Sequence, residues 1–322
     1  MRKIIFIAFT VLLFSGCSSN DLQDYKNAIS KTESIEKGKI NIDIQTKLDY
    51  ATEGLTQKQV RDLSYFDQIE LAISAIYDSS SQEEKVIAKS YYNFGGMGFD
   101  SVFYMMGSDM YLKMPVIDGY ISLDKEMLGS IENKSNIIDR DIMKKVWGPL
   151  SSKWNEILQE KDVFKGEKSY ILTEEGQIKT KTYTIEASQK QLNQLAEEFL
   201  KTLEEEEIIE MLIDTNKDTQ LFKDNEIDEQ EILDNMNNYI YKMVLEEFKG
   251  KAYVDFDERL IKEEFYIRMS WKQPEKGMPK SMELTVTTEY LNLGKEQSFE
   301  FPAVSEDEWL NLEEIGEQVW NY

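Results

Sequence analysis

The sequence predicts an α+β protein, in which a broad antiparallel β-sheet carries helices packed on its apolar face. Two observations lead to this prediction. Several segments alternate between apolar and polar residues, which is typical of a sheet that is dry on one face and wet on the other. Other segments have a helical period and begin with capping sequences. No linker rich in Pro, Gly or Ser divides the body, so one domain is expected.

The first residues have the pattern of an export signal. Arg2 and Lys3 precede an apolar run from Ile4 to Phe14. As a helix this run would reach only about 17 Å, against roughly 30 Å of bilayer hydrocarbon, so it is too short for an ordinary membrane span. It indicates the apolar region of a signal peptide.

The end of the leader resembles the lipobox of bacterial lipoproteins. Ser15, Gly16 and Cys17 match that motif, whereas Phe14 stands where the family usually has Leu. The resemblance implies cleavage between Gly16 and Cys17 and a diacylglyceryl group, with palmitate as a typical acyl chain, on the Cys17 sulfur. Residues 1–16 are then the lipoprotein signal peptide, and residues 17–20 are the lipidated cysteine and its tether. An ordinary signal peptide with an incidental cysteine is the alternative.

The leader also predicts a location. The chain is expected on the extracytoplasmic face of the cell membrane, held there by the acyl chains because a net charge of −24 repels anionic lipids. Lysine supplies 32 of the 37 basic residues, which is consistent with an AT-rich genome and suggests a Gram-positive source.

The first half of the body, which starts at residue 21, is interpreted as a helix followed by hairpins. Residues 21–37 have a helical pattern that Gly38 should end. Residues 39–50 alternate strictly, and residues 69–77 repeat the pattern. Turn sequences at residues 107–109 and 118–119 then separate short apolar strands of a meander.

The second half mixes helices and strands. A helical period spans about 136–159, although Gly148-Pro149 should kink or divide it. Strands at 163–173 and 177–185 meet at Glu175-Gly176. Ser188 with Gln191 and Asp228 with Glu231 form capping boxes, which predict two helices in an acidic segment of about 188–248. Strands at 251–257, 260–270 and 281–290 complete the body.

Composition excludes several function classes. The chain has no His and a single Cys, Cys17, so it has no imidazole for a Ser-His-Asp triad or for metal ligation, and no disulfide. Its 61 acidic residues against 37 basic ones make nucleic acid an unfavourable partner. No cofactor, metal site or catalytic residue is predicted. Asp214 begins like a calcium loop, but Thr219 and Asn225 stand where such a loop needs Gly and Glu.

The order of these elements resembles the bacterial lipoprotein-carrier superfamily. The resemblance rests on the lipobox, the opening helix and alternating strand, the strand at residues 110–114 before Asp118-Gly119, and the segments at 253–262, 289–292 and 299–302. It implies a single domain over residues 21–322 whose large sheet curves into a half-barrel. Helices would pack on the apolar concave face, around a cavity for acyl chains. The helical insertion at about 188–248 is larger than is usual in this family.

A run of flexible apolar side chains inside the meander is the candidate ligand-binding site. Met side chains beside aromatic rings suit an adaptable pocket, although core packing is the plainer interpretation of each one. The candidates are Met97, Phe99, Phe103, Met105, Met110 and Met114.

The sequence therefore favours a lipid-anchored, non-enzymatic binding protein that holds a lipid or acylated ligand between sheet and helices. A sensor or interaction subunit that docks on a membrane or envelope protein, of unknown identity, is the alternative. A hydrolase that uses two carboxylates is a third hypothesis, because such chemistry needs no His.

Overall fold

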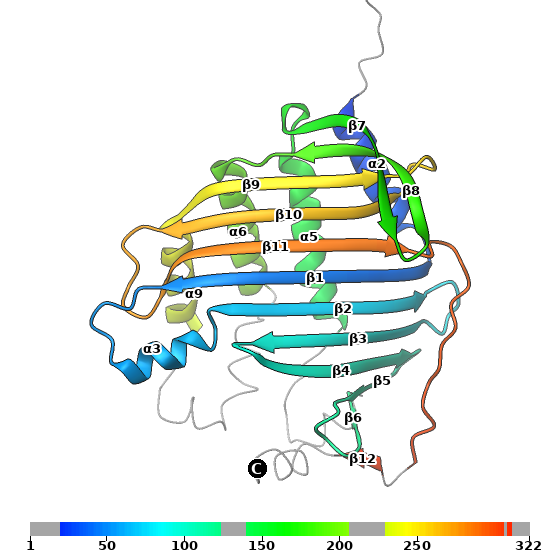
Figure 1. The fold of residues 1–322 in the computed structure, drawn as a ribbon, viewed down its shortest axis with the longest axis horizontal. Helices are drawn as coiled ribbons and strands as arrows, with labels where there is room; N and C mark the ends of the chain where they lie inside the picture. The colour runs from blue at the N-terminus through cyan, green and yellow to red at the C-terminus, as the bar shows by residue number, and fades with distance from the viewer. Residues whose placement is uncertain (1–19, 124–139, 206–228, 306–307, 311–322) are drawn as a thin grey trace, which may run out of the picture.

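The computed structural model describes residues 20–123, 140–205, 229–305 and 308–310. Within them the chain is an α+β protein with one large, open, curved sheet of twelve strands (Figure 1). The strands are β1 (Lys37–Tyr50), β2 (Gln68–Asp78), β3 (Lys85–Phe94), β4 (Met97–Met106), β5 (Asp109–Lys113), β6 (Tyr120–Ser122), β7 (Val163–Thr173), β8 (Gly176–Ile185), β9 (Met243–Val254), β10 (Leu260–Trp271), β11 (Pro279–Leu291) and β12 (Trp309–Leu310).

Five helices accompany the sheet in the described part of the chain. They are α2 (Asp21–Glu33), α3 (Gln57–Ser64), α5 (Arg140–Ile157), α6 (Gln189–Glu205) and α9 (Glu229–Tyr241). A short 3-10 helix at Glu160–Asp162 leads into β7. In Figure 1, α2, α5 and α6 lie behind the sheet, on the same side of it.

The strand order is β12-β6-β5-β4-β3-β2-β1-β11-β10-β9-β8-β7, so β7 and β12 form the two edges. Neighbouring strands are antiparallel, except for the parallel pair β12 and β6. The chain builds the sheet outward in two directions: β1 to β6 form a meander on one side of β1, and β7 to β11 return to pair with its other side through β11.

The main core lies where α2 and the end of α5 meet β7 to β10. Tyr25, Ala28 and Thr32 are buried on one face of α2, at the spacing of successive helical turns. Asn20 caps this helix by accepting a hydrogen bond from the Gln23 N–H at 3.0 Å. The remaining fully buried members of the cluster are Leu158, Val163, Tyr183, Ile185, Ala252, Val254 and Leu260.

Several elements differ from the sequence prediction. The first helix ends at Glu33, before the predicted end at Gly38. Gly38 lies inside β1, where a larger residue would be crowded because its Cβ would lie 2.9 Å from the Tyr77 hydroxyl. The helix α5 continues through Pro149 without division. Helix α3 was not predicted, although Thr56 and Gln59 form a complete capping box before it.

The segment before residue 251 also differs. Residues 243–248 begin strand β9, where the sequence predicted the end of a helical segment. The register between β9 and β10 shifts between Arg268 and Met269, so that Arg268 pairs with Glu247 and Met269 pairs with Leu245. This bulge interrupts the alternation of apolar and polar residues in β9, so the first half of the strand does not show a continuous period of two in the sequence.

Candidate functional site

The predicted ligand-binding side chains share one face of the sheet. Met97, Phe99, Phe103 and Met105 occupy alternate positions of β4 and therefore point to the same side. Met105 pairs with Met110 of β5, which places Met110 on that side too. Met114 follows the last residue of β5 and is partly buried. Register thus brings together five of the six predicted residues.

These side chains differ in how much solvent reaches them. Met97 is 52% exposed and Phe99 is 40% exposed, whereas Met105 is buried. Phe103 and Met110 are intermediate. The face is therefore open near the β3–β4 turn and becomes more enclosed toward the other end of β4.

The same apolar face continues across β3, β2 and β1. Cross-strand pairs connect Phe103 to Ala88, Ala88 to Ala75, and Ala75 to Ile40. Most apolar side chains of this region are only partly buried, in contrast to the core under α2. The partly buried members on β1 and β2 are Ile40, Ile42, Ile44, Leu48, Ile69, Leu71 and Ile73.

Small side chains occupy the middle of this region. Ala75 and Ala88 are opposite each other, and the hydroxyls of Ser90 and Ser101 are 2.6 Å apart. These side chains are shorter than Phe103 and the isoleucines of β1 on the same face.

Glu263 lies on this apolar face and was missed at the sequence level. In β10 it occupies the register position between Ile261 and Phe265, and it pairs with Thr288 of β11. The hydroxyl of Tyr25 donates a hydrogen bond of 2.7 Å to its carboxylate. The sequence contains a signal for this residue, because Glu263 is a charged side chain among the apolar positions of an alternating strand.

The surroundings of Glu263 favour its neutral form. Burial raises the pKa of its carboxyl to about 7, and the nearby charge of Glu33 adds to this effect, while the hydrogen bond from Tyr25 opposes it. Burial, together with the Glu263 charge, raises the pKa of the Tyr25 hydroxyl. The same two causes raise the pKa of Tyr290. The interior between α2 and the sheet is thus a poor environment for a negative charge.

A polar hollow of about 320 Å³ lies elsewhere, between the end of α5 and the start of α6. Its lining includes Glu156, Lys161, Lys190 and Gln194. The buried Gln191 amide beside it donates to the Ile157 carbonyl at 2.9 Å and to Asp162 at 2.6 Å, so this side chain is satisfied within the fold.

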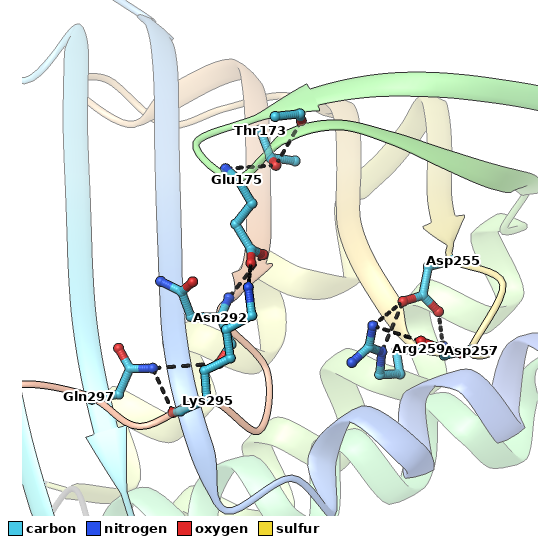
Figure 2. Close-up of polar contacts among 9 residues, drawn as sticks. Thr173, Glu175, Asp255, Asp257, Arg259, Asn292, Lys295 and Gln297 are labelled. Carbon is cyan, nitrogen blue, oxygen red and sulfur yellow. Dashed lines mark hydrogen bonds and ion pairs between the residues drawn. The ribbon is translucent and has the colours of Figure 1, made fainter.

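An ionic network holds one end of the sheet together (Figure 2). Glu175, at the tip of the β7–β8 hairpin, accepts a hydrogen bond of 3.0 Å from the backbone N–H of Asn292 and pairs with Lys295. In the β9–β10 turn, Asp255 accepts two hydrogen bonds from the Arg259 guanidinium, at 2.9 and 2.7 Å. The hairpin tip is therefore fastened to the segment that follows β11.

Within the described residues, no group of three or more His, Cys, Asp or Glu side chains is placed to hold a metal ion. Nor does any helix there combine the length and the hydropathy that crossing a membrane requires. The predicted cleavage and lipidation residues, Gly16 and Cys17, and the loop beginning at Asp214 lie outside the described residues. These expectations stay predictions.

Comparison with known proteins adds no assignment. No protein-family model matches this chain, and no curated protein matches it significantly.

Proposed function

We propose that this chain is a lipid-anchored, extracytoplasmic binding protein that holds an acyl chain on the apolar face of its curved sheet and carries out no chemical step. The anchor is the diacylglyceryl group on Cys17, following the resemblance of Ser15-Gly16-Cys17 to a lipobox. In this proposal the helices pack on the concave side of the sheet, and the ligand occupies the part of that side around β1 to β5.

The observation that carries the proposal is the uneven burial of one apolar face. Under α2, residues such as Ile185, Ala252 and Leu260 are fully buried. On β1, β2 and β4, apolar residues of the same face remain partly exposed. Covering apolar surface is favourable by roughly 25 cal/mol per Å², so this area is suited to an apolar ligand.

The dimensions of the face suit an acyl chain. From Ser101 on β4 to Ile42 on β1, the cross-strand pairs form one row that spans three strand spacings, or about 14 Å. One acyl tail fills about half of the roughly 30 Å hydrocarbon core of a bilayer. The row therefore has about the length of an acyl chain laid across the strands.

The proposal is tested first by the contents of the protein. The exported protein is purified from membranes, its lipids are extracted, and both are analysed by mass spectrometry. We expect a diacylglyceryl adduct at Cys17 and a separate, non-covalent acyl compound. A protein that is empty and that also fails to bind fluorescent fatty acids would contradict the binding function, and an unmodified Cys17 would contradict the anchor.

A matched pair of variants then locates the ligand. Phe99→Ser removes an aromatic ring that is 40% exposed on the proposed face, and Tyr91→Ser removes one that is 38% exposed on the opposite face of the neighbouring strand. We expect Phe99→Ser to weaken fatty-acid binding roughly three- to tenfold, because part of a phenyl contact is lost. Tyr91→Ser should leave it unchanged. Equal effects of the two variants would place the ligand elsewhere.

A further inference from the structure

An exposed patch of apolar and basic side chains lies on the β7–β8 hairpin and the β9–β10 turn. We define it as Lys168, Tyr170, Leu172, Lys179 and Phe256. Leu172 is 82% exposed, Tyr170 is 59% exposed and Phe256 is 52% exposed. The ammonium of Lys179 lies 5.8 Å from the centre of the Tyr170 ring and 5.5 Å from that of Phe256. Lys168 lies 5.7 Å from the Phe256 ring, so the members form one continuous patch.

The register explains why the patch faces one way. Tyr170 pairs with Lys179, and Leu172 pairs with Gln177, two residues further along each strand. Lys168 and its partner Lys181 continue the same side of the hairpin. Tyr170 and Leu172 therefore point to the same side of β7, and both are exposed.

The charge of the patch is opposite to that of the whole chain. The protein has a net charge of −24, and some lysines elsewhere in the sheet pair with carboxylates, as Lys39 does with Glu174 at 2.6 Å. Among the described residues, no carboxylate forms an ion pair with Lys168, Lys179 or Lys181. Lys168 and Lys179 therefore place two ammonium groups beside the exposed rings of Tyr170 and Phe256, with the exposed Glu167 as the neighbour of Lys168 in the sequence.

The hairpin that carries the patch is fixed at both ends. At its base, the Lys165 N–H donates a 3.0 Å hydrogen bond to Asp21, the first residue of α2. At its tip, Glu175 is bound by Asn292 and Lys295 (Figure 2). The exposed side chains are thus held by a hairpin that is anchored to the rest of the sheet.

We infer that this patch rests on the surface of an anionic phospholipid bilayer and orients the body on the membrane. The inference depends on the proposed lipid anchor. Cys17 is three residues from Asn20, and three residues span at most about 11 Å. Asn20 is fixed to the body, because its side chain donates to Glu160 at 3.1 Å and caps α2. The acyl chains would therefore hold the base of the hairpin close to the lipid head groups.

The composition of the patch fits that surface. Aromatic rings and leucine enter the boundary between head groups and acyl chains, while lysine ammonium groups reach the phosphates. Each lysine near an anionic membrane contributes favourable energy, whereas the acidic remainder of the body is repelled. Attraction and repulsion together favour one orientation.

Site-specific labelling tests the orientation. Once Cys17 is acylated, the chain has no other thiol, so Leu172→Cys provides a single position for an environment-sensitive fluorophore. The labelled lipoprotein is reconstituted into vesicles of phosphatidylglycerol and phosphatidylcholine in equal parts. We expect a blue-shifted emission that is quenched by spin-labelled lipid. Tyr91→Cys, on the outer face of β3, is the matched control and should show neither effect.

The contribution of the lysines is tested in the same preparation. Reversing Lys168 and Lys179 to glutamate on the Leu172→Cys background should reduce the docked population roughly tenfold or more. Vesicles of phosphatidylcholine alone should give a similar reduction. Quenching that is unaffected by either change would overturn the role of charge.

The other outcomes separate this inference from the proposed anchor. Absence of quenching at position 172, or equal quenching at positions 172 and 91, overturns the inference. Quenching seen only in native membranes points to a protein partner and also overturns it. If mass spectrometry finds Cys17 unmodified, the anchor proposal fails. The mature chain that carries Cys17→Ser and the label at Leu172→Cys is then tested with the anionic vesicles. Quenching of this label would support membrane binding by the patch without an anchor. Absence of quenching would reject membrane binding by the patch as well.

Discussion

Replacing Glu263 with glutamine should change how the stability of this protein depends on pH. In the folded state the pKa of this carboxyl is raised from 4.5 to about 7, mainly by burial. Between these values the folded chain holds more protons than the unfolded chain, so the free energy of unfolding falls as the pH rises. The contribution of Glu263 to the free energy of unfolding is fully present below pH 4.5, and it is lost as the pH rises through 7.

The shift of about 2.5 pKa units corresponds to at most about 3 kcal/mol, at roughly 1.4 kcal/mol per unit. The groups that face the carboxyl from the adjacent elements are Tyr25 and Glu33 of α2 and Tyr290 of β11. A glutamine keeps an acceptor for the Tyr25 hydroxyl but carries no charge. We therefore expect Glu263→Gln to be more stable than the natural chain above pH 7, by up to about 3 kcal/mol, and equal to it near pH 4.5.

Urea unfolding followed by tryptophan fluorescence at a series of pH values measures this difference. Glu264→Gln is the control, because Glu264 is the next residue of β10, points to the opposite face and pairs with Lys262 at 3.1 Å. If the curves of Glu263→Gln and the natural chain ran parallel from pH 4.5 to pH 8, the account of Glu263 as a buried, proton-binding group would be refuted.

Two further substitutions test the packing around the sheet. Thr32→Val should lower the free energy of unfolding by about 1 to 3 kcal/mol, because the buried Leu260 N–H loses the hydroxyl that accepts its 2.7 Å hydrogen bond; an unchanged urea midpoint would contradict this. Gly95→Ala should cost about 2 kcal/mol more than Gly96→Ala. Both residues have positive φ, but only at Gly95 would an added Cβ clash with the backbone, because it would lie 2.6 Å from the Cα of Tyr65. Equal thermal unfolding midpoints of the two variants would contradict this clash.

Much of the sheet was predictable because most of its strands are solvated on one face. The alternation at 39–50 predicted β1, and the sequence Glu175-Gly176 located the turn between β7 and β8. Ser188 and Gln191 form the predicted reciprocal hydrogen bonds, with the Ser188 N–H donating to Gln191 at 2.8 Å. Local patterns such as these depend on neighbours in the sequence, so the sequence contains them directly.

The failures have a different origin. The bulge near Glu247 displaced the pattern of β9. At Gly148-Pro149 the sequence predicted a kink or a division, and α5 is not divided there. The burial of Glu263 depends on where α2 lies over β10, a contact between residues more than two hundred positions apart. For the candidate site, the shared face of β4 and β5 follows from alternation and one turn. How completely helices cover that face depends on long-range packing, which a local pattern does not contain.

The two proposed surfaces are far enough apart to be tested independently. The tip of the β7–β8 hairpin bends back to β1, where Glu174 pairs with Lys39 at 2.6 Å. Lys39 and Phe99 nevertheless point to opposite faces of the sheet, because Phe99 lies in line with Ile44 across three strand spacings and Ile44 is five residues from Lys39, a separation of about 22 Å between Phe99 and Lys39. One acyl tail, about half of a roughly 30 Å hydrocarbon core, does not span that distance. Phe99→Ser should therefore leave membrane docking unchanged, and the label at position 172 should leave fatty-acid binding unchanged. If either change affected both measurements, the ligand site and the membrane contact would be coupled, and the ligand would have to lie nearer to the hairpin than β4.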